Sequence, residues 1–274
     1  MRVGKPKILV YDLEISQTKF TVENYGRKLY SPYLRSKDIV RPKTILSAAW
    51  KYLGDDKVNV ISVKHTDVFN DEGIVRVLHP LILEADYLIA HHNDGFDIKE
   101  FNGRALYYGL APTQKPPWEC IDTLKIARKY FKLDANDLSF LARFLELDPK
   151  DDSPNWDKIH KGDEQEIRYM RQYNRQDVIT LEQVYHKLKA WDARPSINIG
   201  AIIDKRDEEG KRVDLCPSCG GGHIIHCGYK TNRAKTKTKK NMQCKDCLRQ
   251  FLVGDWIHIL KMPPKQSKYY RPRS

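Results

Sequence analysis

The chain has 274 residues, of which 41% are hydrophobic and 31% charged, and this composition is typical of a globular protein with one sizeable domain and one small one. It contains no apolar run near the roughly 20 residues of a membrane span and no secretory leader, so we expect a cytoplasmic protein without a membrane partner. Six cysteines, four of them in two C-x-x-C pairs, favour metal ligation in a reducing compartment over a disulfide framework.

The positive charge is concentrated in the last third of the chain. Residues 194–274 carry 18 Lys+Arg and 7 Asp+Glu, a net charge of +11 out of the +12 of the whole chain. This asymmetry favours a polyanionic partner, and a generically basic solvated tail is the alternative.

The segment 7–14 has the apolar, β-branched character of a strand. Because side chains alternate between the two faces of a strand, Asp12 and Glu14 share one face. Two neighbouring carboxylates are costly to bury unless a hard divalent cation binds their oxygens. The pair therefore predicts a metal site, although a solvated strand end would show the same triplet.

The segments that follow predict a mixed α/β protein. A stretch rich in Tyr, Arg and Lys at 16–41 is either a nucleic-acid contact or a surface connection. Strands at 45–53 and 57–65 flank a turn at 54–56. A helix at 71–83, which contains Pro80, precedes a further strand at 87–90. Further helices are predicted at 97–108, from 123 onward, at 138–145 and at 163–188. In open α/β sheets, functional sites gather at the ends of the strands.

Four carboxylates and a tyrosine occupy positions that these elements could bring together. Tyr173 and Asp177 are four residues apart on a predicted helix and share a face. This helix could deliver Asp177 to Asp12, Glu14 and Asp97, which would form a site for two metal ions of the kind that hydrolyses phosphodiesters. Tyr173 would then orient the attacking water.

Three motifs resemble those of the DnaQ-like 3′–5′ exonuclease superfamily, in its DEDD tyrosine subgroup. They are Asp12-Leu13-Glu14, Asn93-Asp94-Gly95-Phe96-Asp97 and Tyr173-Asn174-Arg175-Gln176-Asp177, in that order. Gln172 stands where the histidine subgroup carries its histidine. The resemblance covers residues 7–192 and extends to ribonuclease-H-like predicted exonucleases of bacteria and phages.

The resemblance implies a ribonuclease-H-like α/β fold, a mixed sheet flanked by helices, and release of nucleoside monophosphates from 3′ ends. It also implies two Mg²⁺ or Mn²⁺ ions held by Asp12, Glu14, Asp97 and Asp177, with Tyr173 as the fifth catalytic residue. We predict that Phe96 contacts nucleic acid, whereas Asn93 either contacts it or forms a turn. His91 and His92 are expected to shape the cleft, because four oxygen ligands suit Mg²⁺ without imidazole. A structure-specific endonuclease and a non-catalytic binding module are the alternative functions.

The C-terminal third predicts a zinc ribbon. Cys216-x-x-Cys219 and Cys244-x-x-Cys247 are separated by 24 residues, a spacing typical of four thiolates around one structural Zn²⁺. His223, His226 and Cys227 are competing ligands. The segment between the knuckles is dense in cations that suit phosphate contact, and these are Lys230, Arg233, Lys235, Lys237, Lys239 and Lys240. Trp256, Tyr269 and Tyr270 are candidates for base stacking.

These observations predict a domain order. We expect the exonuclease domain at 1–193, a linker at 194–212, the zinc ribbon at 213–260 and a basic tail at 261–274. The expected partner is nucleic acid, with DNA favoured over RNA.

Overall fold

The structure is a computed structural model, and it describes residues 6–20, 36–113, 115–116, 119–147, 152–192, 209–210 and 213–258. Most of the Tyr-rich stretch, most of the predicted linker and the basic tail with Tyr269 and Tyr270 lie outside the described residues. The chain divides into two compact units, Lys7–Val184 and Met1–Pro6 with Tyr185–Ser274. The domain boundary predicted at residue 193 stays a prediction.

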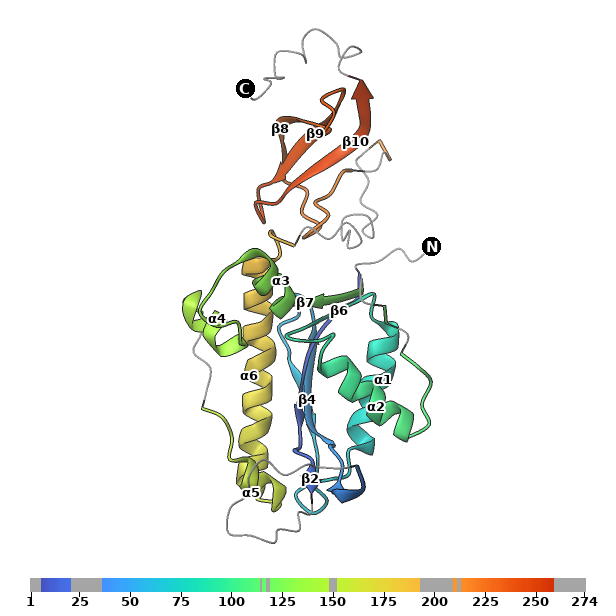
Figure 1. The fold of residues 1–274 in the computed structure, drawn as a ribbon, viewed down its shortest axis with the longest axis vertical. Coiled ribbons are helices and arrows are strands. Elements are labelled where there is room, and N and C mark those ends of the chain that lie inside the picture. The colour runs from blue at the N-terminus through green and yellow to red at the C-terminus, as the bar shows by residue number, and fades with distance from the viewer. Residues whose placement is uncertain are drawn as a thin grey trace. The chain divides into compact units, whose positions relative to one another are not determined.

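A five-stranded mixed sheet forms the centre of the first unit (Figure 1). Its strands, in the order β5-β4-β1-β6-β7, are β5 (Asn59–Ser62), β4 (Ile45–Tyr52), β1 (Ile8–Ile15), β6 (Tyr87–Ala90) and β7 (Cys120–Asp122). β1 pairs antiparallel with β4 and parallel with β6. The central strand β1 is thus the strand that carries the first predicted motif.

Helices cover both faces of this sheet (Figure 1). α1 (Glu72–Glu84) and α2 (Asp97–Tyr107) lie on one side, and the long α6 (Glu164–Leu188) lies on the other. Leu9, Tyr11 and Leu13 of β1 point into the core formed with α1 and α2, and none is more than 5% exposed. The alternation of β1 therefore directs Asp12 and Glu14 to the side of α6. The predicted fold class, a mixed α/β sheet flanked by helices, is confirmed.

Shorter elements complete the first unit. α3 (Thr123–Tyr130), α4 (Leu138–Phe144) and α5 (Trp156–His160) begin after Asp122, Asp137 and Asn155, whose side chains accept backbone N–H groups of the first turn. β2 (Lys19–Phe20) pairs with β3 (Ile39–Arg41), which follows the 3₁₀ turn η1 (Ser36–Asp38). The helices predicted from 123 and at 138–145 are confirmed, whereas β2, β3, β7 and α5 were not predicted.

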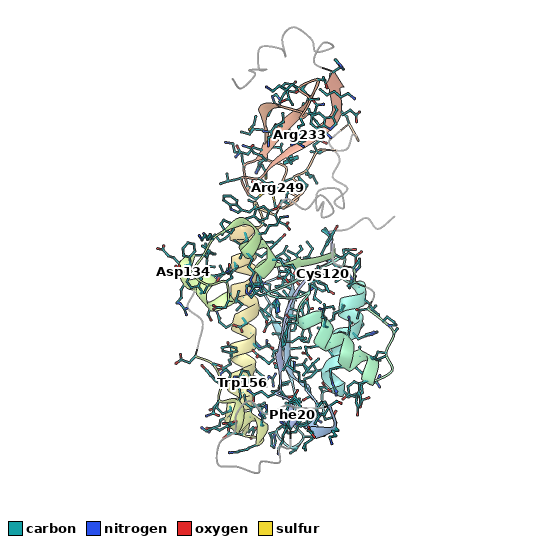
Figure 2. All side chains as sticks on the ribbon, in the orientation of Figure 1. Phe20, Cys120, Asp134, Trp156, Arg233 and Arg249 are labelled. Carbon is teal, nitrogen blue, oxygen red and sulfur yellow. The ribbon has the colours of Figure 1, made fainter. Side chains whose placement is uncertain are left out.

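The second unit contains a three-stranded antiparallel sheet, ordered β10-β9-β8. The strands are β8 (Ile224–Thr231), β9 (Lys237–Cys244) and β10 (Gln250–His258). Asn232 closes the β8–β9 turn by accepting the backbone N–H groups of Thr236 and Lys237. Figure 2 shows the side chains of both units, with Arg233 and Arg249 labelled in the second unit.

Among the described residues, no helix has the length and apolar character needed to cross a lipid bilayer.

Candidate functional site

Three carboxylates from two distant elements converge beside the sheet. Asp12 and Glu14 of β1 and Asp177 of α6 each place a ligand oxygen within 4.8 Å of the other two. Asp177 is 4% exposed, and the other two are half-buried. Carboxylate oxygens at this separation are a ligand set that hard divalent cations prefer. The structure therefore brings together three of the four predicted metal ligands.

Asp97, the fourth predicted ligand, lies next to this cluster but is not part of it. It is the first residue of α2 and is 3% exposed, and the backbone N–H of Leu13, the residue between Asp12 and Glu14, is near enough to lower the pKa of its carboxyl group. Burial raises the pKa of Asp97 to about 7, while that N–H opposes the shift. A cation near this carboxylate would stabilise its ionised form.

Asn174 orients Asp12 and was missed by the sequence analysis. Its Nδ2 donates to Asp12 Oδ2 at 2.7 Å, and its Oδ1 accepts the hydroxyl of Ser47 at 2.8 Å. Both Asn174 and Ser47 are fully buried, so this relay from β4 through α6 to β1 is shielded from water. The spacing could have revealed it, because Asn174 and Asp177 are three residues apart and share a helix face.

The second motif forms a turn before α2 in which His92 and Gly95 are exposed and Asn93 is buried. Asn93 is fully buried and its Oδ1 accepts the hydroxyl of Tyr11, which extends from the opposite face of β1. This position fits the turn-forming alternative for Asn93 and leaves no exposed surface for nucleic acid. Burial and the neighbouring Asp97 raise the pKa of Tyr11 well above its ordinary value, so the hydroxyl keeps its proton and donates.

Asp122 and His91 hold the same turn from the side of α3. The Asp122 carboxylate accepts the backbone N–H groups of His92 at 3.0 Å and Asp94 at 3.4 Å, in addition to capping α3. His91 contacts the Thr123 hydroxyl through Nδ1 and the Asn136 carbonyl through Nε2, both at 2.9 Å. Both ring nitrogens of His91 are thus engaged, and its expected role in shaping a cleft stays a prediction.

Two predicted substrate-facing residues lie at the edge of the cluster. Phe96 directly precedes Asp97 and is partly exposed, with Lys43 Nζ 5.6 Å from the centre of its ring. Tyr173 is partly exposed on α6, one turn before Asp177, as its spacing predicted. Phe96 and Tyr173 are therefore close in the chain to Asp97 and Asp177, whereas Lys43 comes from the connection between β3 and β4 and pairs with Glu100.

The four predicted zinc cysteines form a second cluster. The sulfur atoms of Cys216, Cys219, Cys244 and Cys247 all lie within 4.8 Å of one another, and two of the pairs are 3.6 Å apart. A tetrahedral zinc with bonds of about 2.3 Å separates its sulfurs by about 3.8 Å, so the cluster fits this ion. Backbone N–H groups of Ser218 and Gly221 point at two of the sulfurs from 3.4 Å, as expected for thiolates.

The competing zinc ligands lie outside this cluster. His223 forms an ion pair with Asp246 at 2.8 Å, and the thiol of Cys227 is exposed on β8. Hydrogen bonds within the cluster lower the pKa of Cys247 and raise the pKa of Cys216, as expected when one thiol donates to a neighbouring thiolate. The four-cysteine ligand set is the one that the geometry supports.

The predicted cations of the ribbon are distributed over its hairpin. Arg233 and Lys235 lie in the turn between β8 and β9, and the other four lie on the two strands. Lys239 is half-buried, and the remaining five are exposed. Lys240 pairs with Tyr229 and projects from the face opposite Lys239, so the six do not share one surface.

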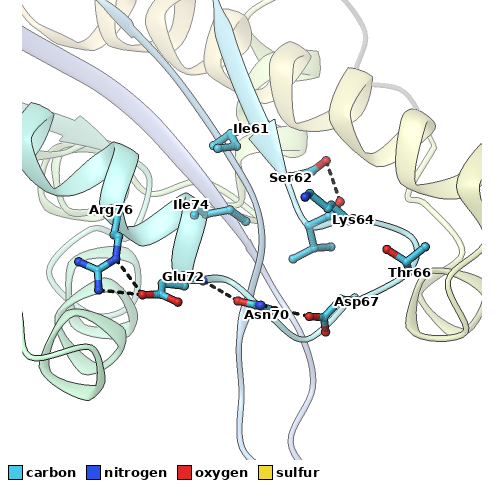
Figure 3. A pocket seen from close by; sticks show the side chains of 11 residues that line it. Ile61, Ser62, Lys64, Thr66, Asp67, Asn70, Glu72, Ile74 and Arg76 are labelled. Atoms are coloured by element: carbon cyan, nitrogen blue, oxygen red, sulfur yellow. Dashed lines mark hydrogen bonds and ion pairs between the residues drawn. The ribbon is translucent and has the colours of Figure 1, made fainter.

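A separate cavity of about 640 Å³ lies beside edge strand β5 and the start of α1 (Figure 3). Its lining includes Ser62, Lys64, Asn70, Glu72 and Arg76, and none of the predicted site residues. Arg76 pairs with Glu72 at 2.7 Å, and Asn70 accepts the Glu72 backbone N–H. Its charged groups are thus partly neutralised within the lining, and the cavity is distinct from the carboxylate cluster.

Comparison with known families decides the assignment of the first unit. The sequence model of the RNase H superfamily matches residues 40–189, more than half of the 274 residues. The chain belongs to the RNase H superfamily. Membership of the RNase H superfamily supports a nuclease-type function on nucleic acid.

A solved structure agrees with this RNase H fold. The family B DNA polymerase from the hyperthermophilic archaeon Pyrobaculum calidifontis superimposes with a TM-score of 0.50 and 14% sequence identity, over 71% of this chain. The match spans 26% of the polymerase, so the likeness concerns the fold of one part of it. No curated protein matches the sequence significantly.

Proposed function

We propose that this protein is a metal-dependent 3′–5′ exonuclease that hydrolyses phosphodiester bonds of nucleic acid, with DNA favoured over RNA. The observation that carries the proposal is the convergence of Asp12, Glu14 and Asp177 within 4.8 Å, next to buried Asp97. Membership of the RNase H superfamily supports nuclease chemistry. The ordered motifs of the DEDD tyrosine subgroup support the exonuclease assignment within it.

The four carboxylates are proposed to hold two divalent ions, Mg²⁺ or Mn²⁺. When bound, such a pair supplies the positive charge that stabilises the attacking and leaving oxygens of an in-line displacement. Asn174 fixes the orientation of Asp12 through its 2.7 Å hydrogen bond, so that one oxygen of this carboxylate remains directed at the cluster. The nearby Leu13 N–H favours the ionised form of Asp97.

Tyr173 and Phe96 are proposed to act on the water and on the substrate. The hydroxyl of Tyr173, one helical turn from Asp177, orients the attacking water by a hydrogen bond. The Phe96 ring offers a stacking surface for a terminal base, and the Lys43 ammonium group, 5.6 Å from that ring, is held by an ion pair with Glu100 at 2.7 Å. The zinc ribbon contributes further affinity for nucleic acid through cations on one face of its sheet.

The test is digestion of oligonucleotides that carry one label, at either the 5′ or the 3′ end. With Mg²⁺ or Mn²⁺, we expect 5′-labelled strands to shorten stepwise and 3′-labelled strands to release labelled mononucleotide first. The control omits the divalent ion rather than adding a chelator, because a chelator would also remove structural zinc. Discrete internal products would replace the proposal with an endonuclease, and binding without cleavage would replace it with a recruitment module.

A further inference from the structure

One face of the ribbon sheet carries three lysines. Lys230 of β8 pairs directly with Lys239 of β9, and Lys237 of β9 pairs with His258 of β10. Direct antiparallel partners share a face, and alternate residues of one strand share a face. Thr238, between the two β9 lysines, is fully buried on the other side. Lys230, Lys237 and Lys239 therefore project together from the exposed face.

A bulge in edge strand β10 adds Trp256 to this face. Three residues of β10, Gly254 to Trp256, lie opposite the single residue Lys239 of β9. Gly254 has φ +78°, a conformation that favours glycine, and bulges of this kind redirect the following side chain. Lys239 Nζ lies 6.0 Å from the centre of the Trp256 ring, and Trp256 is 42% exposed. The ring and the ammonium group are thus neighbours on one accessible surface.

The charge of this face is not neutralised within the ribbon. Residues 224–258 contain eight Lys+Arg and two Asp+Glu. The ion pair found in the described part of the ribbon joins His223 to Asp246, and in that part no carboxylate pairs with the three lysines of the face. The ammonium groups are therefore available to phosphates.

We propose that this face, formed by Lys230, Lys237, Lys239 and Trp256, binds single-stranded nucleic acid. A base stacks on the Trp256 indole while the lysines contact the phosphates that flank it, which is the chemistry of single-strand platforms. A closed duplex covers its base faces with neighbouring pairs, so the tryptophan selects single strands. Phosphates and base faces are common to DNA and RNA, and this face binds both.

This proposal rests on the proposed function, because it takes the zinc ribbon to hold the substrate of the nuclease unit. It specifies that the ribbon presents a single strand to the nuclease unit. Lys240, one of the predicted phosphate contacts, is not part of this face, because it projects from the opposite side with Tyr229 and Val253. It neighbours Lys239, is exposed and carries the same charge, so it provides a matched control.

The experiment measures binding of the full chain carrying Asp12→Asn, without added Mg²⁺, by fluorescence anisotropy over a series of salt concentrations. The probes are oligo(dT), oligo(U) and a duplex closed by hairpins at both ends. We expect both single strands to bind more tightly than the closed duplex. Trp256→Ala should weaken single-strand binding roughly 5–150-fold, the range for one lost base stack, and Trp256→Phe should restore much of it.

The lysine variants test the face itself. Lys239→Gln should lower the log–log salt slope for single strands by about 0.7, whereas Lys240→Gln should leave the slope unchanged. Equal slopes for these two variants, or unchanged affinity in Trp256→Ala, would overturn the proposal. Tighter binding of the closed duplex would overturn it as well. Because no cleavage is measured, its failure is distinguishable from failure of the exonuclease proposal.

Discussion

Asn174 connects the third motif to the first through a single buried amide. It donates to Asp12 and accepts from Ser47, and both partners lie on neighbouring strands of the sheet. A metal-binding carboxylate that is held in this way keeps one rotamer, which reduces the entropy lost when a cation binds. The side chain thus supports the site without touching the substrate.

We predict that Asn174→Ala lowers cleavage by roughly 10–100-fold, the usual effect of removing a partner that orients a metal ligand. The loss should be partly recovered at raised Mg²⁺ or Mn²⁺ concentration, because the defect lies in holding the ion. The measurement is the cleavage rate as a function of metal concentration. Arg175→Ala, an exposed neighbour on α6, serves as the control. An unchanged metal dependence in Asn174→Ala would show that Asn174 only packs.

His91 predicts a pH dependence of stability. Burial lowers its pKa to about 4 in the folded protein, whereas an unfolded histidine titrates near 6.5. The folded state therefore favours the neutral ring, and this contribution is complete above pH 6.5 and is lost as the pH falls from about 6.5 toward 4. The full shift in the pKa of His91 corresponds to roughly 3 kcal/mol in the free energy of unfolding.

Urea unfolding of wild type and His91→Gln at several pH values measures this contribution. The free energy of unfolding of wild type should fall more steeply with acidification than that of His91→Gln. The remaining slope belongs to other groups, among them His160, whose pKa burial also lowers. Parallel pH profiles for the two proteins would contradict the assigned role of His91.

The acidic residues of the candidate site could be predicted from the sequence, but the hydrogen bonds that hold the site in place could not. Asp12, Glu14 and Asp177 were predictable because strand and helix periodicities determine which side chains share a face. The role of Ser47 was not, because a serine within a strand has many roles, and Asp122 was expected only to cap the helix that follows it, which it does. Their contacts with Asn174 and with the His92–Asp94 turn arise only from tertiary packing.

At the scale of elements, a buried ion pair fixes α6 against β4. Lys51 Nζ lies 2.5 Å from Glu182 Oε2, both side chains are at most 12% exposed, and Glu182 Oε1 accepts the backbone N–H of Gly54. Glu182 follows Asp177 on α6, so this contact also sets the position of the helix that carries the third motif. Truncating one partner would leave the other charge buried.

We predict that Lys51→Met destabilises the protein by about 3–5 kcal/mol, since the buried Glu182 carboxylate loses the ammonium group 2.5 Å away. Urea unfolding is the measurement. The matched control is Lys7→Met, which removes an exposed pair with Glu84 and should cost less than about 1 kcal/mol. Similar losses for the two variants would indicate that the Lys51 pair is effectively solvated.

The sequence predicted long elements better than short ones. β1, β4, α1 and α6 follow from eight or more residues of consistent periodicity. β7 has three residues and is a strand only because Leu88 to Ala90 pair with it, and α5 has five residues. Elements this short carry too little local pattern to compete with the packing that forms them.

At the scale of the whole molecule, the carboxylate cluster and the excess positive charge lie in different units. The carboxylate cluster lies within Lys7–Val184, whereas the net charge of +11 lies in residues 194–274. The ribbon has few buried residues beyond Cys216, Cys244 and Thr238, so its fold depends on the metal more than on a core.

We predict that Cys216→Ser loses zinc and unfolds the ribbon while retaining cleavage of short oligonucleotides at high concentration. Affinity for long strands should fall, and its salt dependence should become shallower as phosphate contacts are lost. Metal analysis and a salt titration of binding check this outcome. Cys227→Ser, which changes an exposed cysteine outside the cluster, should behave as wild type. Unchanged affinity in zinc-free Cys216→Ser would assign the ribbon a different role.

We propose that four carboxylates form one catalytic metal site. The decisive measurement is the cleavage rate of four single variants, Asp12→Ala, Glu14→Ala, Asp97→Ala and Asp177→Ala. We predict that each loses at least roughly 100–1000-fold in rate, with folding and zinc content intact. Glu164→Ala, an exposed carboxylate on α6 paired with Arg168, should retain the wild-type rate. A wild-type rate in Asp97→Ala, the ligand outside the three-carboxylate cluster, would contradict the four-carboxylate site.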